Sequence, residues 1–401
     1  MKPTLFESLC RALVYRRLAS VQYGTLHVHE GEITTTFVGK LVAPGQNYIA
    51  EITVFDCSFY IDALVRGSIG VAESYMKQHW QSKDMVMLIQ WTIVNQTTLN
   101  KLELFSKYFA QPILLLGHFL RRNTKRTSKS NIAKHYDLGN DFFKLFLDES
   151  MMYSSAIFKN PQSTLLEATY TKLELICEKL ALTKNDSVLE IGTGWGGFAM
   201  YAVKRYGCKV TTTTISENQY HYVQKLIAKE NLSDSITLLK TDYRNLSGSY
   251  NKIVSIEMLE AVGHQYFDIY LSIISELLKP KGLALIQTIT IKEQNYQSSL
   301  RSVDFIQKYI FPGGCLPSLT ALMQSMVRST DLSVEDIENI GKHYAKTLYH
   351  WRKNYLQQLD QVRALGCTNS FINMWEFYFC YCEAGFLEKE ILDYQILLSK
   401  P

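Results

Sequence analysis

The sequence predicts an α/β protein in two parts, a doubly wound parallel sheet preceded by a smaller α+β module. The 401 residues are enough for two domains with a sizeable core. From residue 131 onward, short apolar runs alternate with helical patterns, and a glycine-rich turn joins the first run to a helix. This succession is typical of parallel strands with helices on both faces. We expect strands at Ser187–Ile191, Lys209–Ile215, Ile236–Lys240, Lys252–Ile256 and Leu283–Thr290.

The first part, placed at residues 1–124, mixes strand and helix patterns. Thr25–His29 and Ile33–Val38 alternate apolar and polar residues around a Glu-Gly-Glu turn, which predicts a hairpin. Glu51–Phe55 is expected to form a further strand. The spacing of apolar residues predicts helices at Tyr60–Met76 and Ser82–Val94.

An apolar stretch followed by a basic one ends this part. Tyr108–Leu120 is too short to span a bilayer, and polar residues and a proline interrupt it. Residues 121–129 carry five basic and no acidic side chains. They form either a solvated linker or a contact for anionic lipid headgroups, worth about 1 kcal/mol per basic residue. The apolar–basic pairing favours peripheral membrane contact through 121–129.

The glycine turn lies in Ser187–Val203, which reads SVLEIGTGWGGFAMYAV. Gly192 and Gly194 are expected to allow a tight turn and the close approach of a ligand, and Gly197 to let the helix pack on the strand. The backbone N–H groups at the start of the helix would face an adenosine or phosphate. An ordinary strand–helix turn is the alternative, because such a glycine pattern alone is weak.

The ends of the next two strands carry further candidate ligands. Glu217 stands where an acid could bind a ribose, but Ser216 before it predicts a helix cap, which explains an acid there equally well. Asp242 and Tyr243 follow the third strand and could hold an adenine. These positions place an adenosine in the cleft without saying which cofactor carries it.

Composition excludes several classes of protein. The net charge of +4 is too small to indicate a nucleic-acid partner. Aromatic residues make up 12% of the chain, which fits a tyrosine-rich core or a pocket for an apolar ligand. The eight cysteines show no metal-ligand spacing, so no metal is expected, and without a signal peptide they fit a reducing cytoplasm.

Several ordered segments resemble the cyclopropane-fatty-acyl-phospholipid synthases and the related mycolic acid cyclopropane synthases. Residues 131–158 resemble the opening of their catalytic part, and Leu189–Gly197 resembles their S-adenosylmethionine loop, where Trp195 is distinctive. Ser255–Gly263 resembles their active-site strand end. The resemblance covers residues 131–401 and reaches back to Gly67–Trp80.

The resemblance implies a Rossmann-like class I methyltransferase domain at residues 125–401. The methyl of S-adenosylmethionine would pass to the cis double bond of an unsaturated acyl chain of a membrane phospholipid. The resulting carbocation would lose a proton to a bound bicarbonate ion, closing a cyclopropane ring. Tyr136 and Tyr153 would stabilise the cation by their π faces, and His135 belongs to the same catalytic set. The cofactor would be held by Tyr153, Ser154, Glu190, Gly192, Gly194, Trp195, Gly196, Thr214, Ser216, Gln219, Asp242 and Tyr243.

The implied bicarbonate site is where this chain departs from the family. Its ligands would be Ser155, Glu260, Gln287, Ile289 and Tyr344. The family has a cysteine where Ser155 stands and a histidine where Gln287 stands. A hydroxyl and an amide can still donate to an anion. Because the titratable ring is lost, we expect a different pH response.

Other outcomes stay open at this point. The cation could instead give a methyl- or methylene-branched chain, or the protein could be a non-catalytic lipid-binding relative. The retained Glu260 and Tyr344 argue against binding alone. Near-neutral charge argues against a nucleic-acid methyltransferase, and the Trp195 loop does not fit a dehydrogenase. The resemblance also implies a homodimer and a cytoplasmic enzyme acting at the inner face of the cell membrane.

Overall fold

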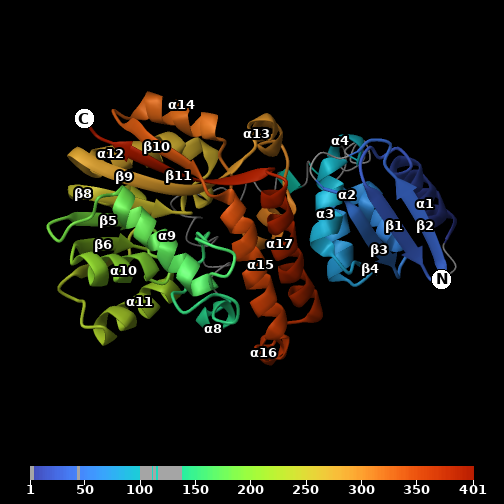
Figure 1. Cartoon of the computed structure of the whole chain (residues 1–401), viewed down its shortest axis with the longest axis horizontal. Helices are drawn as coiled ribbons and strands as arrows, with labels where there is room; N and C mark the ends of the chain where they lie inside the picture. The colour runs from blue at the N-terminus through green and yellow to red at the C-terminus, as the bar shows by residue number, and fades with distance from the viewer. Residues whose placement is uncertain (1–3, 43–45, 100–110, 112–113, 116–137) are drawn as a thin grey trace. The chain divides into compact units, whose positions relative to one another are not determined.

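The computed structural model describes residues 4–42, 46–99, 111, 114–115 and 138–401. The chain divides into two compact units, which we call the N-terminal unit and the catalytic unit (Figure 1). Besides its first 120 residues, the N-terminal unit takes in two later segments that the sequence assigns to the catalytic part. The N-terminal unit comprises Met1–Leu120, Ser299–Ile310 and Tyr355–Glu390, and the catalytic unit comprises Arg121–Ser298, Phe311–Asn354 and Ile391–Pro401.

A seven-stranded sheet, in the order β10-β11-β9-β8-β5-β6-β7, forms the centre of the catalytic unit. The predicted parallel sheet is confirmed for β5 to β9. The sequence did not predict that β11 and β10 extend this sheet in antiparallel pairing beyond β9. The strands are β5 (Ser187–Ile191), β6 (Lys209–Thr213), β7 (Ile236–Leu239), β8 (Tyr250–Ile256), β9 (Leu278–Ile291), β10 (Ser333–Asn339) and β11 (Ile391–Ser399).

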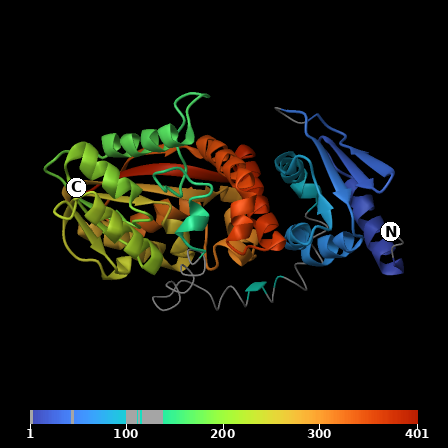
Figure 2. The ribbon, with the colours of Figure 1, turned by 90° about the horizontal axis from the view of Figure 1, so that it is seen from below.

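Helices cover both faces of this sheet because side chains along a strand point alternately to either side. Val188 packs into a core with α9, α10 and α11, whereas its neighbour Leu189 packs into a second core with α12 and α14. Figures 1 and 2 show these two groups of helices on opposite faces. The helices of this unit include α8 (Asn140–Phe143), α9 (Leu165–Lys179), α10 (Gly197–Tyr206), α11 (Glu217–Lys229), α12 (Phe267–Leu277), α13 (Glu293–Ser299), α14 (Leu319–Ser329) and α15 (Gly341–Gln357).

The N-terminal unit has a four-stranded sheet in the order β2-β1-β3-β4. The predicted hairpin is confirmed, with β1 antiparallel to β2, and β1 also pairs in parallel with β3. The helix predicted to start at Ser82 instead starts at Met85, because the Asp84 side chain caps it. Helix α2 is kinked at Gly67, whose φ is 59°. The elements are α1 (Leu5–Leu18), β1 (Thr25–Glu30), β2 (Ile33–Val38), β3 (Ile49–Val54), α2 (Ser58–Met76), β4 (Trp80–Gln81), α3 (Met85–Val94), α4 (Gln96–Leu99), η4 (Ile306–Ile310), α16 (Leu359–Ala364) and α17 (Asn369–Leu387).

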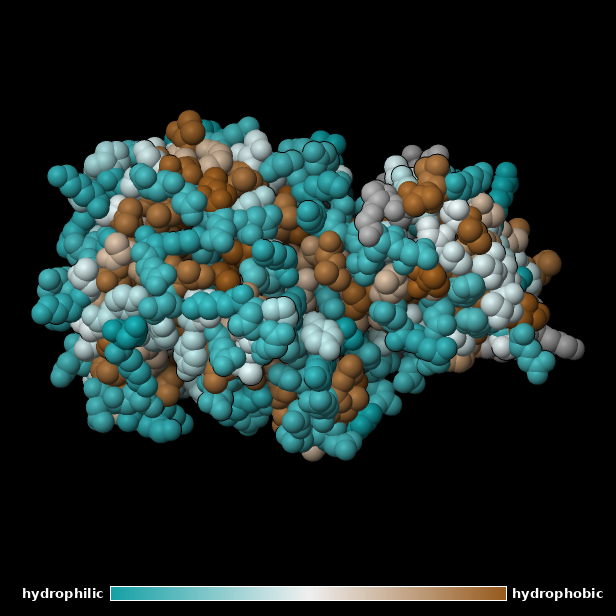
Figure 3. Space-filling view, viewed as in Figure 1, coloured by the Kyte–Doolittle hydropathy of each residue, from teal (hydrophilic) through white to brown (hydrophobic). Residues whose placement is uncertain are grey.

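The surface carries apolar side chains interspersed with hydrophilic ones on the face shown in Figure 3. Helix α1, which the sequence analysis did not predict, exposes Leu5, Phe6 and Leu9 by 91%, 58% and 57%. Within the described ranges, no helix has both the length and the hydropathy to cross a membrane. The predicted membrane contact at 121–129 lies outside the described residues.

Candidate active site

The glycine loop leads from the end of β5 into α10. Gly192, Gly194 and Gly196 have φ angles of 99°, 51° and 87°, a region that only glycine adopts without strain. A Cβ on Gly194 would meet no atom within 4 Å, so the loop is open there to a ligand. A Cβ on Gly197 would lie 2.4 Å from the Met152 Sδ. Gly197 therefore makes room for Met152, which corrects the prediction that it serves helix–strand packing.

Trp195 joins this loop to the segment before α9. Its ring is 3% exposed, and its Nε1–H donates to the Asn140 Oδ1 at 2.8 Å. The ring centroid lies 4.8 Å from that of Phe143. Short helix α8, which carries both partners, is thereby fixed beside the loop. The family-specific tryptophan thus positions the loop from within the protein.

The residues predicted after β6 form the start of α11. The Ser216 side chain caps this helix by accepting from the Gln219 N–H, and the Thr214 hydroxyl donates to the Gln219 Oε1 at 2.8 Å. Glu217 lies in the first turn and forms an ion pair with Lys240. The helix-start interpretation of Glu217 is therefore confirmed.

Two predicted cofactor carboxylates have protein partners. The Glu190 Oε2 accepts from the Thr212 hydroxyl at 2.6 Å, and burial raises the pKa of Glu190 to about 8. The Asp242 carboxylate accepts from the Arg244 Nε at 2.8 Å and from its Nη2 at 2.6 Å. The same guanidinium lies 5.4 Å from the Tyr243 ring centroid. Their binding to a cofactor stays a prediction.

A cluster of aromatic rings packs against Trp195 of the loop. The ring centroid of Tyr153 lies 5.4 Å from that of Phe143 and 5.2 Å from that of Trp351. Ser154, the next residue, accepts a hydrogen bond of 2.8 Å from the Lys172 Nζ. Lys172 is fully buried, and this burial lowers its pKa to about 8. The segment is therefore held by a lysine that the sequence analysis did not single out.

A carboxylate to which the sequence analysis gave no role stands at the centre of the predicted anion site. The Glu257 Oε1 accepts from the Ser155 backbone N–H at 2.8 Å and from the Gln287 Nε2 at 2.8 Å. Its Oε2 accepts from the Tyr344 hydroxyl at 2.7 Å. The Ser155 hydroxyl, which was expected to donate to an anion, instead donates to the Ala156 carbonyl at 3.0 Å.

The backbone of Glu257 has a strained conformation, as is often found for residues at functional sites. Its φ is 50°, in the left-handed region where a non-glycine residue costs on the order of 1 kcal/mol. Its N–H donates to the Gln287 carbonyl at 2.8 Å, so the strained residue is held to the neighbouring strand β9. Such strain persists where the surrounding structure enforces it, often at functional sites.

Glu260, the predicted catalytic carboxylate, faces a different set of partners. Its Oε1 accepts from the Ile289 N–H and from the Thr288 hydroxyl. Its Oε2 is buried and has no hydrogen-bond partner among the described residues. Burial, followed by the nearby charge of Glu257, raises the pKa of Glu260 to about 8. Ile289 therefore contacts Glu260 through its backbone N–H rather than contacting a separate anion.

Asp393 on β11 completes a buried polar network that the sequence analysis missed. Gln287 Nε2 lies 3.3 Å from the Asp393 Oδ2 while also donating to Glu257, and the Gln287 Oε1 accepts from the Gln395 Nε2 at 3.1 Å. Burial, followed by the charges of Glu257 and Glu260, raises the pKa of Asp393. No local motif marks Asp393, because antiparallel pairing of β11 with β9 alone brings it here.

Comparison with known proteins decides the family. A family model described as mycolic acid cyclopropane synthetase matches residues 123–396. The chain belongs to this family.

Individual members show both sequence and structural likeness. The tuberculostearic acid methyltransferase UfaA1 of Mycobacterium tuberculosis is 34% identical over 84% of this chain and 82% of its own length. The cyclopropane-fatty-acyl-phospholipid synthase of Escherichia coli is 33% identical over 88% of both chains. The crystal structure of mycolic acid cyclopropane synthase CmaA1 complexed with SAH and CTAB superposes with a TM-score of 0.64, at 31% identity over 68% of this chain and 98% of that one.

This cyclopropane synthetase family member is an S-adenosylmethionine-dependent methyltransferase. The doubly wound fold and the cofactor expected from the sequence are thereby confirmed. The open side of Gly194 fits the approach of such a cofactor to the loop. His135 and Tyr136, placed in the catalytic set by resemblance, lie outside the described residues.

The predicted bicarbonate ion does not fit the residues present. Ser155, Gln287 and Tyr344 were expected to donate to it, yet all three donate to the Glu257 carboxylate. Ile289, a fourth expected ligand, donates to Glu260. A second anion would compete with the Glu257 carboxylate for donors that are already engaged. Burial raises the pKa of Glu257, against the opposing hydrogen bonds from Tyr344 and Ser155 and the charge of Lys172. A carboxyl group of the protein itself therefore stands among the donors expected to hold the ion.

Proposed function

We propose that this methyltransferase adds a methyl group to the cis double bond of an unsaturated fatty acyl chain, and that Glu257 accepts the proton released. The observation that supports this is the Glu257 carboxylate, held by Ser155, Gln287 and Tyr344. The resemblance predicts an anionic base at the same donors. A tethered carboxylate supplies that charge without a diffusible ion, and its fixed position favours proton transfer.

Before the proton is lost, the methyl transfer creates a carbocation, which the site must stabilise. When bound, S-adenosylmethionine supplies the electrophilic methyl group. The π electrons of the substrate form the new carbon–carbon bond as the sulfur–methyl bond breaks, and the adjacent carbon becomes cationic. Tyr153, which is half-buried, would stabilise that charge with its ring, while the fully buried Phe143 and Trp351 pack behind it. Their burial also keeps away water, which would add to the cation.

Two products are compatible with proton loss from the added methyl. If the electrons of the broken C–H bond attack the cationic carbon, a cyclopropane forms. If a hydride first moves from the methylated carbon to the cationic carbon, the same proton loss leaves a methylene branch. In both cases Glu257 takes the proton, and atoms and charge balance without another reactant.

We infer that the methylene-branched product forms in preference to the ring. The resemblance associates ring closure with a bicarbonate site containing a cysteine and a histidine, and here Ser155, Gln287 and Glu257 stand in that site. The relatives support either outcome, since one is named a tuberculostearic acid methyltransferase and another a cyclopropane-fatty-acyl-phospholipid synthase. Ring closure is therefore the second candidate.

The experiment uses S-adenosylmethionine with a trideuterated methyl group and an oleoyl phospholipid. Proton removal from the added carbon leaves two deuterons in the product, in a methylene group or in a ring, which NMR separates. Retention of three deuterons would show that another carbon loses its proton and would overturn the role of Glu257. Glu257→Gln should lower turnover by roughly 10² to 10⁴ fold. Glu230→Gln, which changes a half-exposed carboxylate paired with Lys204 on the same unit, should preserve turnover.

The lipid and the site of action belong to the same proposal. We propose a membrane phospholipid as the substrate, contacted peripherally through the basic residues 121–129 at the inner, cytoplasmic face of the membrane. Replacing Arg121 and Arg122 together by Gln should weaken co-sedimentation with anionic vesicles. Unchanged binding would place the membrane contact elsewhere. A homodimer and the absence of a nucleic-acid partner stay predictions.

A further inference from the structure

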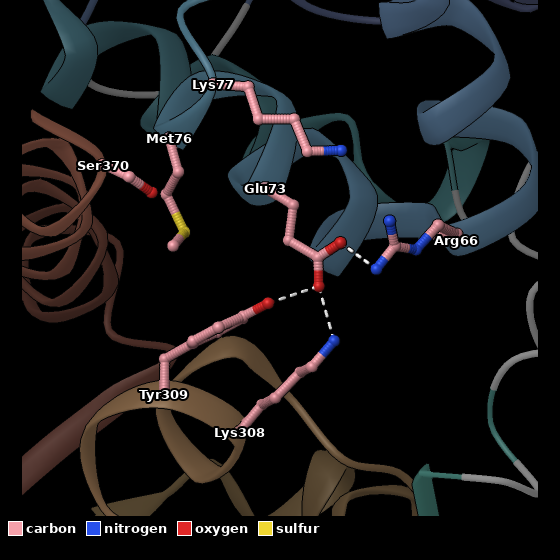
Figure 4. Close-up of a pocket in the computed structure, with 7 residues that line it drawn as sticks. All are labelled: Arg66, Glu73, Met76, Lys77, Lys308, Tyr309 and Ser370. Atoms are coloured by element: carbon pink, nitrogen blue, oxygen red, sulfur yellow. Dashed lines mark hydrogen bonds and ion pairs between the residues drawn. The ribbon is translucent and has the colours of Figure 1, made fainter.

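A cavity of about 270 Å³ lies within the N-terminal unit, away from every residue assigned above (Figure 4). It opens between helix α2, the turn η4 and the first turn of α17. Since one water occupies about 30 Å³ of liquid, the cavity has room for a phosphate with a small attached group. Its polar lining consists of Arg66, Glu73, Lys77, Lys308, Tyr309 and Ser370.

Glu73 organises the charges on the floor of this cavity. Its side chain is 6% exposed, forms ion pairs with Arg66 and Lys308, and accepts from the Tyr309 hydroxyl at 2.5 Å. Burial opposes ionisation, but the hydrogen bonds from Lys308 and Tyr309 and the nearby cations outweigh it and lower the pKa of Glu73. The carboxylate is therefore ionised, fully partnered and able to fix two cations in place.

Lys77 supplies positive charge beyond what Glu73 neutralises. It directly follows α2, is exposed, and forms no ion pair within the described part of the chain. Figure 4 shows its ammonium group extending into the space beside Glu73 and Arg66. Arg66 also pairs with Asp62 at 3.6 Å, so the three cationic side chains face two carboxylates. They leave an excess of one positive charge at neutral pH. An uncompensated excess of this kind attracts an anion.

The start of α17 adds a hydroxyl group to the lining of the cavity, beyond Met76 (Figure 4). Ser370 lies in the first turn of this helix and lines the cavity with its side chain. Helix N-termini carry a partial positive charge and N–H groups without intrahelical partners. The hydroxyl, this helix end and the ammonium of Lys77 surround the opening with groups that favour negative charge.

We propose that this cavity binds a phosphate group, with Lys77, the partly exposed faces of Arg66 and Lys308, and Ser370 as its ligands. A guanidinium fork and two ammonium groups from different elements match the several oxygens of a tetrahedral phosphate. Its lining is mainly charged and polar, which suits a phosphate rather than an acyl chain. The ligand is therefore the phosphate of a lipid headgroup or of a soluble phosphate compound. The proposal that the phosphate belongs to a lipid headgroup rests on the proposed function, whereas the proposal that the cavity binds phosphate does not.

The first test measures inorganic phosphate binding to the full chain by calorimetry, with chloride at equal ionic strength as the reference. Lys77→Glu should weaken binding about tenfold or more, because two unit charges change beside the ligand. Ser370→Ala should weaken it less. Lys40→Glu, the same change at an exposed site elsewhere on this unit, should leave it unchanged. Thermal denaturation checks that all variants fold alike.

A second arm separates the two sources of phosphate. Vesicles of phosphatidylcholine containing phosphatidylglycerol are co-sedimented with the wild type and the same variants. A loss of binding in Lys77→Glu, together with competition by inorganic phosphate, identifies a lipid headgroup. Dependence on Lys77 for inorganic phosphate alone identifies a soluble phosphate compound. If neither ligand distinguishes Lys77→Glu from Lys40→Glu, the proposal is overturned. Both arms omit S-adenosylmethionine and turnover, so the outcome is independent of the proposed reaction.

Discussion

Replacing Glu257 by Gly tests the proposed base and the proposed anion site at once. Glycine adopts the observed φ of 50° without strain, so the backbone should keep its conformation. The change removes the carboxylate but leaves the Ser155 N–H, the Gln287 amide and the Tyr344 hydroxyl around the vacated space. Loss of a general base lowers turnover by roughly 10² to 10⁴ fold.

The three donors then predict rescue by a small carboxylate. Each hydrogen bond to a charged group contributes about 1 kcal/mol or more after solvent exchange. Three of them correspond to roughly 3 kcal/mol, or a dissociation constant in the millimolar range. Formate and bicarbonate should therefore restore part of the turnover of Glu257→Gly at millimolar concentration. Benzoate, which is too large for the space of one side chain, should not.

The assay compares turnover of wild type, Glu257→Gly and Glu257→Ala with formate, bicarbonate, benzoate or chloride at fixed ionic strength. Glu257→Ala removes the same carboxylate but retains the strained φ, so it should be less stable than Glu257→Gly by about 1 kcal/mol. The wild type should be indifferent to bicarbonate depletion. Wild-type turnover that requires bicarbonate, or a Glu257→Gly enzyme as active as the wild type without any added anion, would refute the reasoning.

Three further predictions concern the groups around the base. Glu260→Gln should flatten the pH dependence of stability. The buried acid stays protonated to about pH 8 while the unfolded chain ionises near 4.5, so wild-type stability falls on the order of 5 kcal/mol as pH rises between these values. Chemical denaturation should show a smaller fall in the variant. Lys172→Met removes a cation that lowers the pKa of Glu257, so the acidic limb of kcat/KM should move to higher pH; an unmoved limb would contradict this. Trp195→Phe loses the hydrogen bond to Asn140, which should cost about 1 kcal/mol in thermal unfolding and raise the KM for S-adenosylmethionine.

Local sequence patterns were sufficient for the strand–helix alternation and for the glycine loop. Val188 and Leu189 point to opposite faces of β5, and both are apolar and buried. A strand covered by helices on both sides requires this pattern. Gly192 and Gly194 have the positive φ angles that a tight turn before a helix demands. The family followed from the distinctive residues around this loop, Trp195 above all. These features depend on neighbours in sequence, so the sequence alone carries them.

The position of the proposed base depends instead on contacts between distant segments. Glu257 is an unremarkable acid in SIEMLE until the chain brings Ser155, Gln287 and Tyr344 to its two oxygens, from positions 102, 30 and 87 residues away. The sequence pointed to Ser155, Gln287 and Tyr344 as donors and to Glu260 as the nearby carboxylate. It could not show that these donors bind Glu257 instead. Asp393 likewise enters only because β11 pairs antiparallel with β9. The sequence by itself thus determined the parallel part of the sheet, the cofactor, and Gln287 and Tyr344 as neighbours of one site, since these follow local pattern and family resemblance. Only the tertiary structure decided that a side chain of the protein occupies that site, because burial and long-range hydrogen bonds select one carboxylate over another.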